Sequence, residues 1–347
     1  MKKLILLWLL IPLLFMNASA AELLPPAVTG AAQDYVDEDA QTLGMGLSHL
    51  LQKALPLIRP DLAEASRTGL AVIAAVLMVG IVQSFPGTVK QVAELVGVTA
   101  IVSLLLTATN SLIRLGTDTI REMSDYGKLL LPVITAAMAA QGGITSSAAL
   151  YGGTAVFDAL LSSLISELFV PLVYVYVALA AAGGALGDGL LNKMQDMIKG
   201  CVSWSLKTLL TVFTTYMGIT GILSGSTDAA ALKATKVTIS TFVPVVGGIL
   251  SDASEAVLVS AGLAKSAAGL YGILAILALF LEPFLKIGAH YLLLKITAAI
   301  SGLLGSKRMS GVVENFSTAM GLLLGMTGSV CLLQLISTVC FMKGVGQ

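Results

Sequence analysis

Three ionisable residues at helical spacing are the side chains of this chain best placed for chemistry. Glu282, Lys286 and His290 stand four residues apart inside residues 277–295, a run that is otherwise mostly apolar. On a helix they form one stripe, with Glu282 and Lys286 in the favourable order for an ion pair. A carboxylate and an imidazole placed in this way suit proton or ion binding. Because a charge in lipid costs about 3 kcal/mol on insertion scales, the stripe should face protein or water.

Three interpretations of this stripe compete. Residues 267–304 make 38 residues, nearly two membrane spans, and Pro283 disrupts an ongoing helix, so the stripe could be a surface turn between two helices. This turn is the interpretation that length favours. Alternatively, Glu282 and His290 are titratable groups of an intramembrane pathway for an ion, proton or solute. The third interpretation is a polar contact with another membrane subunit.

The composition is that of an integral membrane protein. Of 347 residues, 56% are hydrophobic and 12% charged, and the mean hydropathy is +0.92, whereas soluble domains carry about 25% charged residues. Lys plus Arg and Asp plus Glu both number 20, so there is no broad basic face for nucleic acid. We therefore expect membrane lipids, and no DNA or RNA, around this chain.

The N-terminus is typical of a secretory signal. Residues 1–20 hold Lys2 and Lys3, an apolar core, and small residues at Ala18 and Ala20, which predicts cleavage after Ala20. An uncleaved anchor is the alternative. Residues 21–67 should then lie outside the cytoplasm as an amphipathic segment with helical apolar spacing over residues 43–55, ended by prolines.

Residues 68–347 are predicted to be a multi-pass, all-α membrane domain. Apolar runs in lipid must be helical, since other backbones would leave amide groups unpaired. We expect seven to nine such segments, and we expect charged residues 114–128 to form a connection. Glycines at four-residue spacing, Gly183 with Gly187 and Gly321 with Gly325, should bring helices close together. The runs are 69–85, 92–113, 129–149, 156–182, 202–223, 237–250 (a weaker one), 267–285, 287–304 and 318–342.

Equal proline spacing suggests an internal repeat. Pro132 and Pro171 are 39 residues apart, as are Pro244 and Pro283, and an acidic residue precedes each second proline, Glu167 in one pair and Glu282 in the other. Repeats with broken helices recur in membrane transporters, including inverted ones. The hypothesis is two related halves meeting at proline-broken helices. Proline is also frequent in membrane helices, so chance explains the spacing equally simply.

Catalytic and cofactor motifs are absent from the sequence. There is no P-loop, dinucleotide fingerprint or His-Glu-x-x-His helix, and His49 and His290 are the only histidines. We predict no enzyme activity, no cofactor and no metal site. The three cysteines lack metal-ligand spacing and are expected to be small apolar side chains.

A resemblance to a known family covers essentially the whole chain and is most specific over residues 212–272. These read VFTTYMGITGILSGSTDAAALKATKVTISTFVPVVGGILSDASEAVLVSAGLAKSAAGLYG and are similar to the stage III sporulation protein AE family of endospore-forming bacteria. The resemblance implies a polytopic protein of the mother-cell membrane that surrounds the forespore. It also implies partners: other membrane proteins of the stage III sporulation A operon, a cytoplasmic ATPase subunit and a forespore-side protein.

The function expected from this resemblance is a membrane subunit of a secretion-like channel complex that links mother cell and forespore. One alternative is a stand-alone permease that couples a small solute to an ion gradient, and another is a purely structural scaffold. Within the matched region, Pro244, Gly247 and Gly248 suit a re-entrant or broken segment. An ordinary loop followed by a weakly hydrophobic span explains them equally well.

Overall fold

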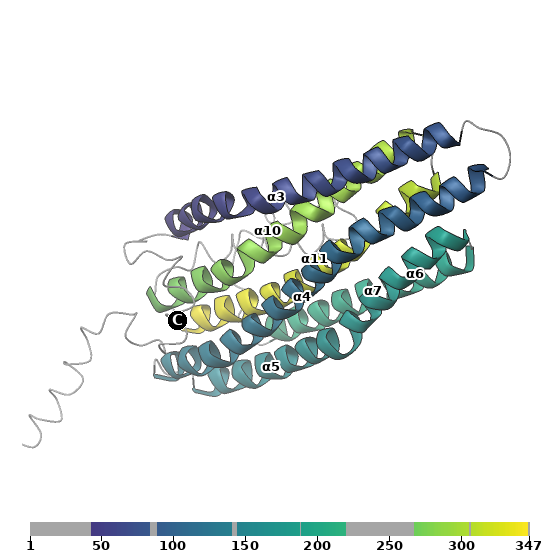
Figure 1. The fold of residues 1–347 in the computed structure, drawn as a ribbon. Coiled ribbons are helices and arrows are strands. Elements are labelled where there is room, and N and C mark those ends of the chain that lie inside the picture. Colours follow the sequence, from purple (N-terminus) through teal and green to yellow (C-terminus); the bar gives the residue numbers. More distant parts are fainter. Residues whose placement is uncertain are drawn as a thin grey trace, which may run out of the picture.

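The chain is all-helical over the residues that its computed structural model describes, which are 43–83, 89–140, 144–187, 189–219, 267–304 and 307–345. This confirms the predicted fold class. Figure 1 shows the helices running side by side along one elongated bundle. The elements are α3 (Leu43–Val82), α4 (Val89–Ala140), α5 (Ile144–Ser163), the π-helical segment η3 (Leu164–Phe169), α6 (Val170–Leu186), α7 (Gly189–Ile219), α10 (Ala267–Leu303) and α11 (Lys307–Val345).

Five helical stretches in the described part are long and apolar enough to cross a membrane. This confirms the polytopic architecture, although several predicted runs fuse into one helix. The run 237–250 lies outside the described residues, and α7, which holds most of the run 202–223, is not among the five. The stretches are Ile58–Val82, Lys90–Ala136, Leu150–Leu186, Gly272–Leu303 and Lys307–Phe341.

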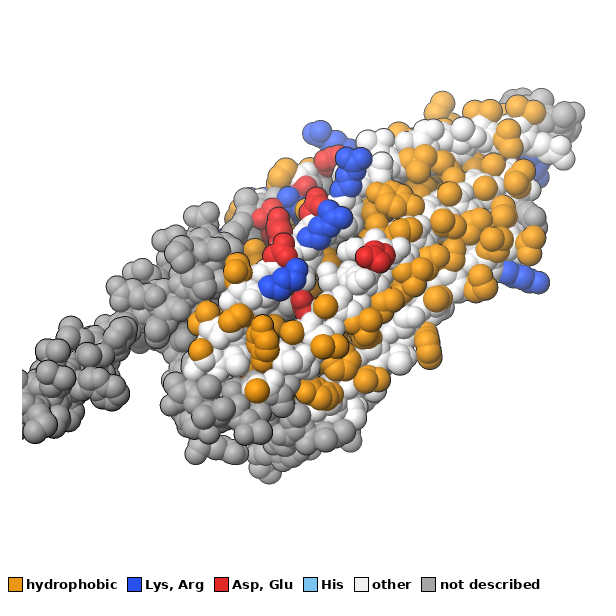
Figure 2. Space-filling view, turned by 90° about the horizontal axis from the view of Figure 1, so that it is seen from below, with side chains coloured by type: hydrophobic (Ala, Val, Ile, Leu, Met, Phe, Trp, Pro, Cys, Tyr) orange, Lys and Arg blue, Asp and Glu red, His pale blue; other side chains and the backbone are white. Residues whose placement is uncertain are grey.

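Charged residues 114–128 do not form a connection, because they lie in the middle of the 52-residue helix α4. The expectation of a loop was wrong because helical spacing places the charges on one outer face. Asp118 and Asp125 are 65% and 71% exposed, and Asp125 pairs with Lys128 at 2.8 Å. Figure 2 shows charged side chains gathered in one strip beside an apolar surface. At 1.5 Å per residue α4 is about 78 Å long, so it extends well beyond a hydrocarbon core of about 30 Å.

Prolines interrupt fewer helices than the sequence suggested. Helix α10 runs through Pro283 without a turn, and α3 runs through Pro56 and Pro60. The predicted surface turn at Glu282–Lys286 and the predicted end of the amphipathic helix are therefore both wrong. Neighbouring helices supply packing that a lone proline-containing helix lacks, which is why membrane helices tolerate proline. Helix α3 also crosses the expected domain boundary at residue 67.

Pro171 does mark an irregularity. It lies in the first turn of α6, directly after η3. There the Val170 amide bonds to the Ile165 carbonyl, five residues back. Proline has no amide hydrogen to complete the ordinary α-helical ladder, and a π-helical turn just before it absorbs the mismatch. Glu167 lies within this turn and is exposed.

Helix α11 fills the middle of the bundle. Its most apolar window is 94% buried, against 22% for α3. Several hydroxyls along it are satisfied by its own backbone: Ser329 Oγ donates to the Gly325 carbonyl at 2.7 Å and Thr338 Oγ1 to the Gln334 carbonyl at 2.9 Å. Small residues and internally bonded hydroxyls allow neighbours to approach α11 from all sides.

The adjoining ends of α3 and α4, of α6 and α7, and of α10 and α11 lie at one end of the bundle, called here the loop end. Arg308, at the start of α11, donates from Nε to the Gly184 carbonyl at 2.6 Å and lies 3.8 Å from Glu94 near the start of α4. Its Nη2 also bonds to the Ala185 carbonyl. Figure 1 shows the α6–α7 and α10–α11 connections at this end. Helices α6 and α10 therefore both run toward the loop end, and α7 and α11 both run away from it. An inverted repeat would give the two helix pairs opposite directions, so it is contradicted.

Several sequence predictions lie outside the described residues. They are the signal segment with Ala18 and Ala20, most of the acidic segment, and Pro244 with Gly247 and Gly248. Since Pro244 belongs to the second proline pair, a repeat of parallel orientation stays a prediction.

Candidate functional site

The Glu282 stripe lies on α10 and faces α3. Lys286 Nζ is 3.0 Å from Glu282 Oε1 and 3.4 Å from Asp61 Oδ2 of α3. The three side chains are 24–28% exposed. The predicted pairing of Glu282 with Lys286 is therefore confirmed. Asp61, which sequence reasoning missed, adds a second carboxylate, so the lysine joins two helices.

His290, the third member of the stripe, does not join the ion pairs. Its Nδ1 contacts the Lys286 carbonyl at 2.9 Å, and its side chain is 9% exposed. Because a carbonyl only accepts, this contact places the proton of a neutral ring on Nδ1 and leaves Nε2 as an acceptor. His290 is thus one helical turn beyond the charged group and held by backbone.

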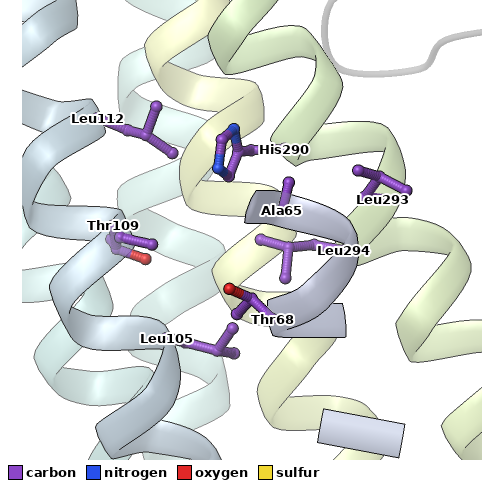
Figure 3. A pocket seen from close by; sticks show the side chains of 9 residues that line it. Ala65, Thr68, Leu105, Thr109, Leu112, His290, Leu293 and Leu294 are labelled. Atoms are coloured by element: carbon purple, nitrogen blue, oxygen red, sulfur yellow. The ribbon is translucent and has the colours of Figure 1, made fainter. Parts of the chain in front are cut away.

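A small pocket lies beside His290, enclosed by α3, α4 and α10 (Figure 3). Its cavity volume is about 10 Å³, close to the space that a single water needs. Thr68 and Thr109 bring hydroxyls to a lining that is otherwise mostly aliphatic. The pocket has room for about one water and none for a solute. The stripe and the pocket together form a polar line between these helices rather than a solute-binding chamber.

Glu167 and Pro171 are not brought into this group. Glu167 is exposed in η3, and among the described residues it forms no ion pair. The structure thus separates the two acidic residues that the proline spacing had linked.

A second polar cluster, which sequence reasoning missed, surrounds Asp158 of α5. Ser124 Oγ of α4 donates to Asp158 Oδ2, and Gln334 Nε2 of α11 donates to Asp158 Oδ1, both at 2.9 Å. One turn away, Ser337 Oγ bonds to Thr154 Oγ1 at 3.2 Å. All five side chains are at most 3% exposed.

Gly127 makes room for this cluster. A Cβ at this position of α4 would overlap the amide of Gln334, the group that bonds to Asp158. The cluster therefore depends on close approach of α4 and α11 at a glycine. The signal that would have found it is a carboxylate, Asp158, within the apolar run 156–182, which holds one other acidic residue, Glu167.

The family model described as stage III sporulation protein AE matches residues 65–344. The chain belongs to this family. Stage III sporulation protein AE of Bacillus subtilis (strain 168) is 23% identical over 218 residues, which cover 63% of this chain and 55% of that protein. The chain thus spans about half the length of this curated relative. No solved structure matches the chain.

The residues matched by the stage III sporulation protein AE family include the Glu282 stripe and the Asp158 cluster, but not Asp61. Glu282, Lys286, His290 and Asp158 lie inside residues 65–344, whereas Asp61 lies just before them. The family region as matched thus includes the central helix α11 and the helices that surround it.

Replacing Lys286 with methionine should destabilise the protein by about 1–3 kcal/mol. The change removes the cation between two half-buried carboxylates, Glu282 and Asp61. The expected loss of stability lies between that of breaking an exposed ion pair and that of breaking a buried one. Thermal unfolding of the purified full chain in detergent measures the loss. Lys295→Met is the control, since Lys295 is 48% exposed and, within the described part of the chain, pairs with Glu314 alone. Equal effects of the two variants would contradict the two-carboxylate arrangement.

Proposed function

We propose that this stage III sporulation protein AE family member is a membrane subunit of a secretion-like channel complex that links mother cell and forespore and supports forespore development. Its place would be the mother-cell membrane around the forespore. The observation that carries the proposal is the family match over residues 65–344, joined to a polytopic helical bundle. The role is non-enzymatic, and the family description names no reaction.

The partners proposed are the other membrane proteins of the stage III sporulation A operon, a cytoplasmic ATPase subunit and a forespore-side protein. The buried α11 supports a subunit role. A path along the axis of one copy would have to displace this helix, whose window is 94% buried. A path between copies, or between this chain and its partners, requires no such displacement.

A stand-alone permease is the second candidate function. The observation in its favour is the line of Asp61, Lys286 and His290 between α3 and α10, because intramembrane ionisable residues commonly mark ion pathways. The one-water pocket beside His290 counts against a solute site there.

Reconstitution separates the two functions. The purified chain alone in liposomes should not take up small solutes under an imposed proton or sodium gradient. Permeability should require the other operon-encoded subunits. In sporulating cells, deletion of the gene should abolish late forespore reporter expression, and the wild-type gene should restore it. Gradient-driven uptake by the chain alone would instead establish the permease.

A further inference from the structure

The outer face of α7 is of mixed character. Met197 and Trp204 on it are each 69% exposed, and charged and small residues lie among them. We call this surface the α7 face. It consists of the exposed residues Lys193, Asp196, Met197, Gly200, Cys201, Trp204, Lys207, Thr208 and Thr211.

The loop end provides a common reference level for the helices. Helices α4 and α7 both begin there, as the Arg308 contacts with Glu94 and Gly184 and the view in Figure 1 show. Residues 95–113 of α4 hold no charged side chain and lie about 9–36 Å from that end. Residues 195–213 of α7 lie at the same distances and hold Asp196, Lys199 and Lys207.

Charges at these levels are incompatible with a lipid-facing α7. The uncharged stretch of α4 is about 28 Å long, close to the thickness of a hydrocarbon core. A Lys or Asp facing lipid at such depth costs about 3 kcal/mol on insertion scales. Helix α7 is also absent from the stretches that are apolar enough to span. Its outer face must therefore meet water or protein.

Ion pairing indicates whether water or protein meets the α7 face. Among the described residues, none forms an ion pair with Lys193, Asp196 or Lys207. Charges without partners need hydration. Gly200 is open, with nothing near the position of a Cβ, and Thr208 and Thr211 are exposed hydroxyls. Such small and polar neighbours leave room for water.

We propose that the α7 face forms one wall of a water-filled path for hydrophilic solutes, while the exposed faces of the uncharged stretches, residues 69–82 of α3 and 95–113 of α4, meet lipid. The proposal rests on the proposed channel function and locates its aqueous surface. The path runs outside the single bundle, between α7 and whatever completes the opposite wall, so the buried α11 stays in place.

Cys201 tests this wall directly. It is exposed on α7, whereas Cys331 and Cys340 are buried, so a sulphonated maleimide should label the folded wild type at Cys201 alone. Membranes that carry the complete complex are opened so that the reagent reaches both sides. Cys201→Ala gives the baseline. The matched lipid-side variant is Cys201→Ala with Leu70→Cys, because Leu70 is 65% exposed and lies twelve residues from the loop end of α3, as Cys201 does from that of α7.

The expected result is at least tenfold faster labelling of Cys201 than of Leu70→Cys, with both labelled after denaturation. Equal fast labelling would place this whole level outside the lipid and overturn the proposal. If neither cysteine were labelled in the folded protein, the α7 face would be buried against lipid or protein, and the proposal would be overturned too. The channel function fails separately, through retained forespore expression in the deletion strain, so the two failures are distinguishable.

Discussion

Replacing Asp158 with alanine is expected to lower the free energy of unfolding by about 3 kcal/mol. Asp158 accepts hydrogen bonds from Ser124 of α4 and Gln334 of α11, so its removal leaves two buried donors without an acceptor. Each unsatisfied buried group costs about 1–3 kcal/mol. The loss is measured by thermal or denaturant unfolding of the purified full chain in detergent.

Two variants assign this loss to hydrogen bonding. Asp158→Asn keeps an oxygen for the Gln334 amide and offers its own amide to the Ser124 hydroxyl, so it should cost less than about 1 kcal/mol. Asp125→Ala removes a nearby carboxylate that is 71% exposed and, as far as the described helices go, is paired only along its own helix, so it should change stability by about 0.5 kcal/mol or less. If Asp158→Ala were as mild as Asp125→Ala, the cluster would not hold the three helices together.

Local spacing was enough to predict the part of the site that is local in sequence. Glu282 and Lys286 are one turn apart, and their pairing follows from helical geometry alone. Asp61 reaches the same lysine from another helix, and the bonds of Asp158 join residues 34 and 176 positions away. Such contacts depend on which helices become neighbours, which periodicity does not encode.

The helices themselves were predictable as apolar segments, but their ends were not. Proline and charge were both taken as signs of interruption. In the structure α10 passes through Pro283, and α4 carries a strip of charges on one side while its opposite side is packed. Tertiary packing outweighs the loss of one backbone hydrogen bond, and an amphipathic helix can continue where a membrane span ends. Among the prolines that the structure describes, only Pro171, beside the π-helical turn, marks a real irregularity.

For one of the two glycine pairs, close helix approach was predicted at the wrong glycine, whereas Gly321 and Gly325 of the other pair are buried in α11. Four-residue spacing pointed to Gly183 and Gly187, yet Gly187 ends α6 in the left-handed conformation, with φ 71°. The adjacent Gly184 is the buried contact. A Cβ there would overlap Val312 of α11 and come within 3.0 Å of Val98 of α4. Three helices therefore meet at a position where only hydrogen fits.

Substitution of Gly184 should consequently be among the most damaging single changes. Val98 and Val312 are 0% and 2% exposed and β-branched, so neither can rotate away cheaply. We expect Gly184→Ala to cost about 1–3 kcal/mol by overpacking, and the larger Gly184→Val to prevent accumulation in membranes. Moving α6 outward offers no escape, because the Arg308 guanidinium bonds to the carbonyls of Gly184 and Ala185.

The neighbouring glycine is the matched control for this prediction. At Gly183 an added Cβ would find its nearest atoms, in Gln195 and Leu191, at 3.6 Å, which is ordinary contact. Gly183→Ala should leave the packing intact and gain about 0.5 kcal/mol, because alanine favours the helix over glycine. Unfolding in detergent and protein level in membranes measure both variants. If alanine were tolerated equally at 183 and 184, α6 would have to lie farther from α4 and α11, and the loop end that defines the level of the α7 face would be built differently.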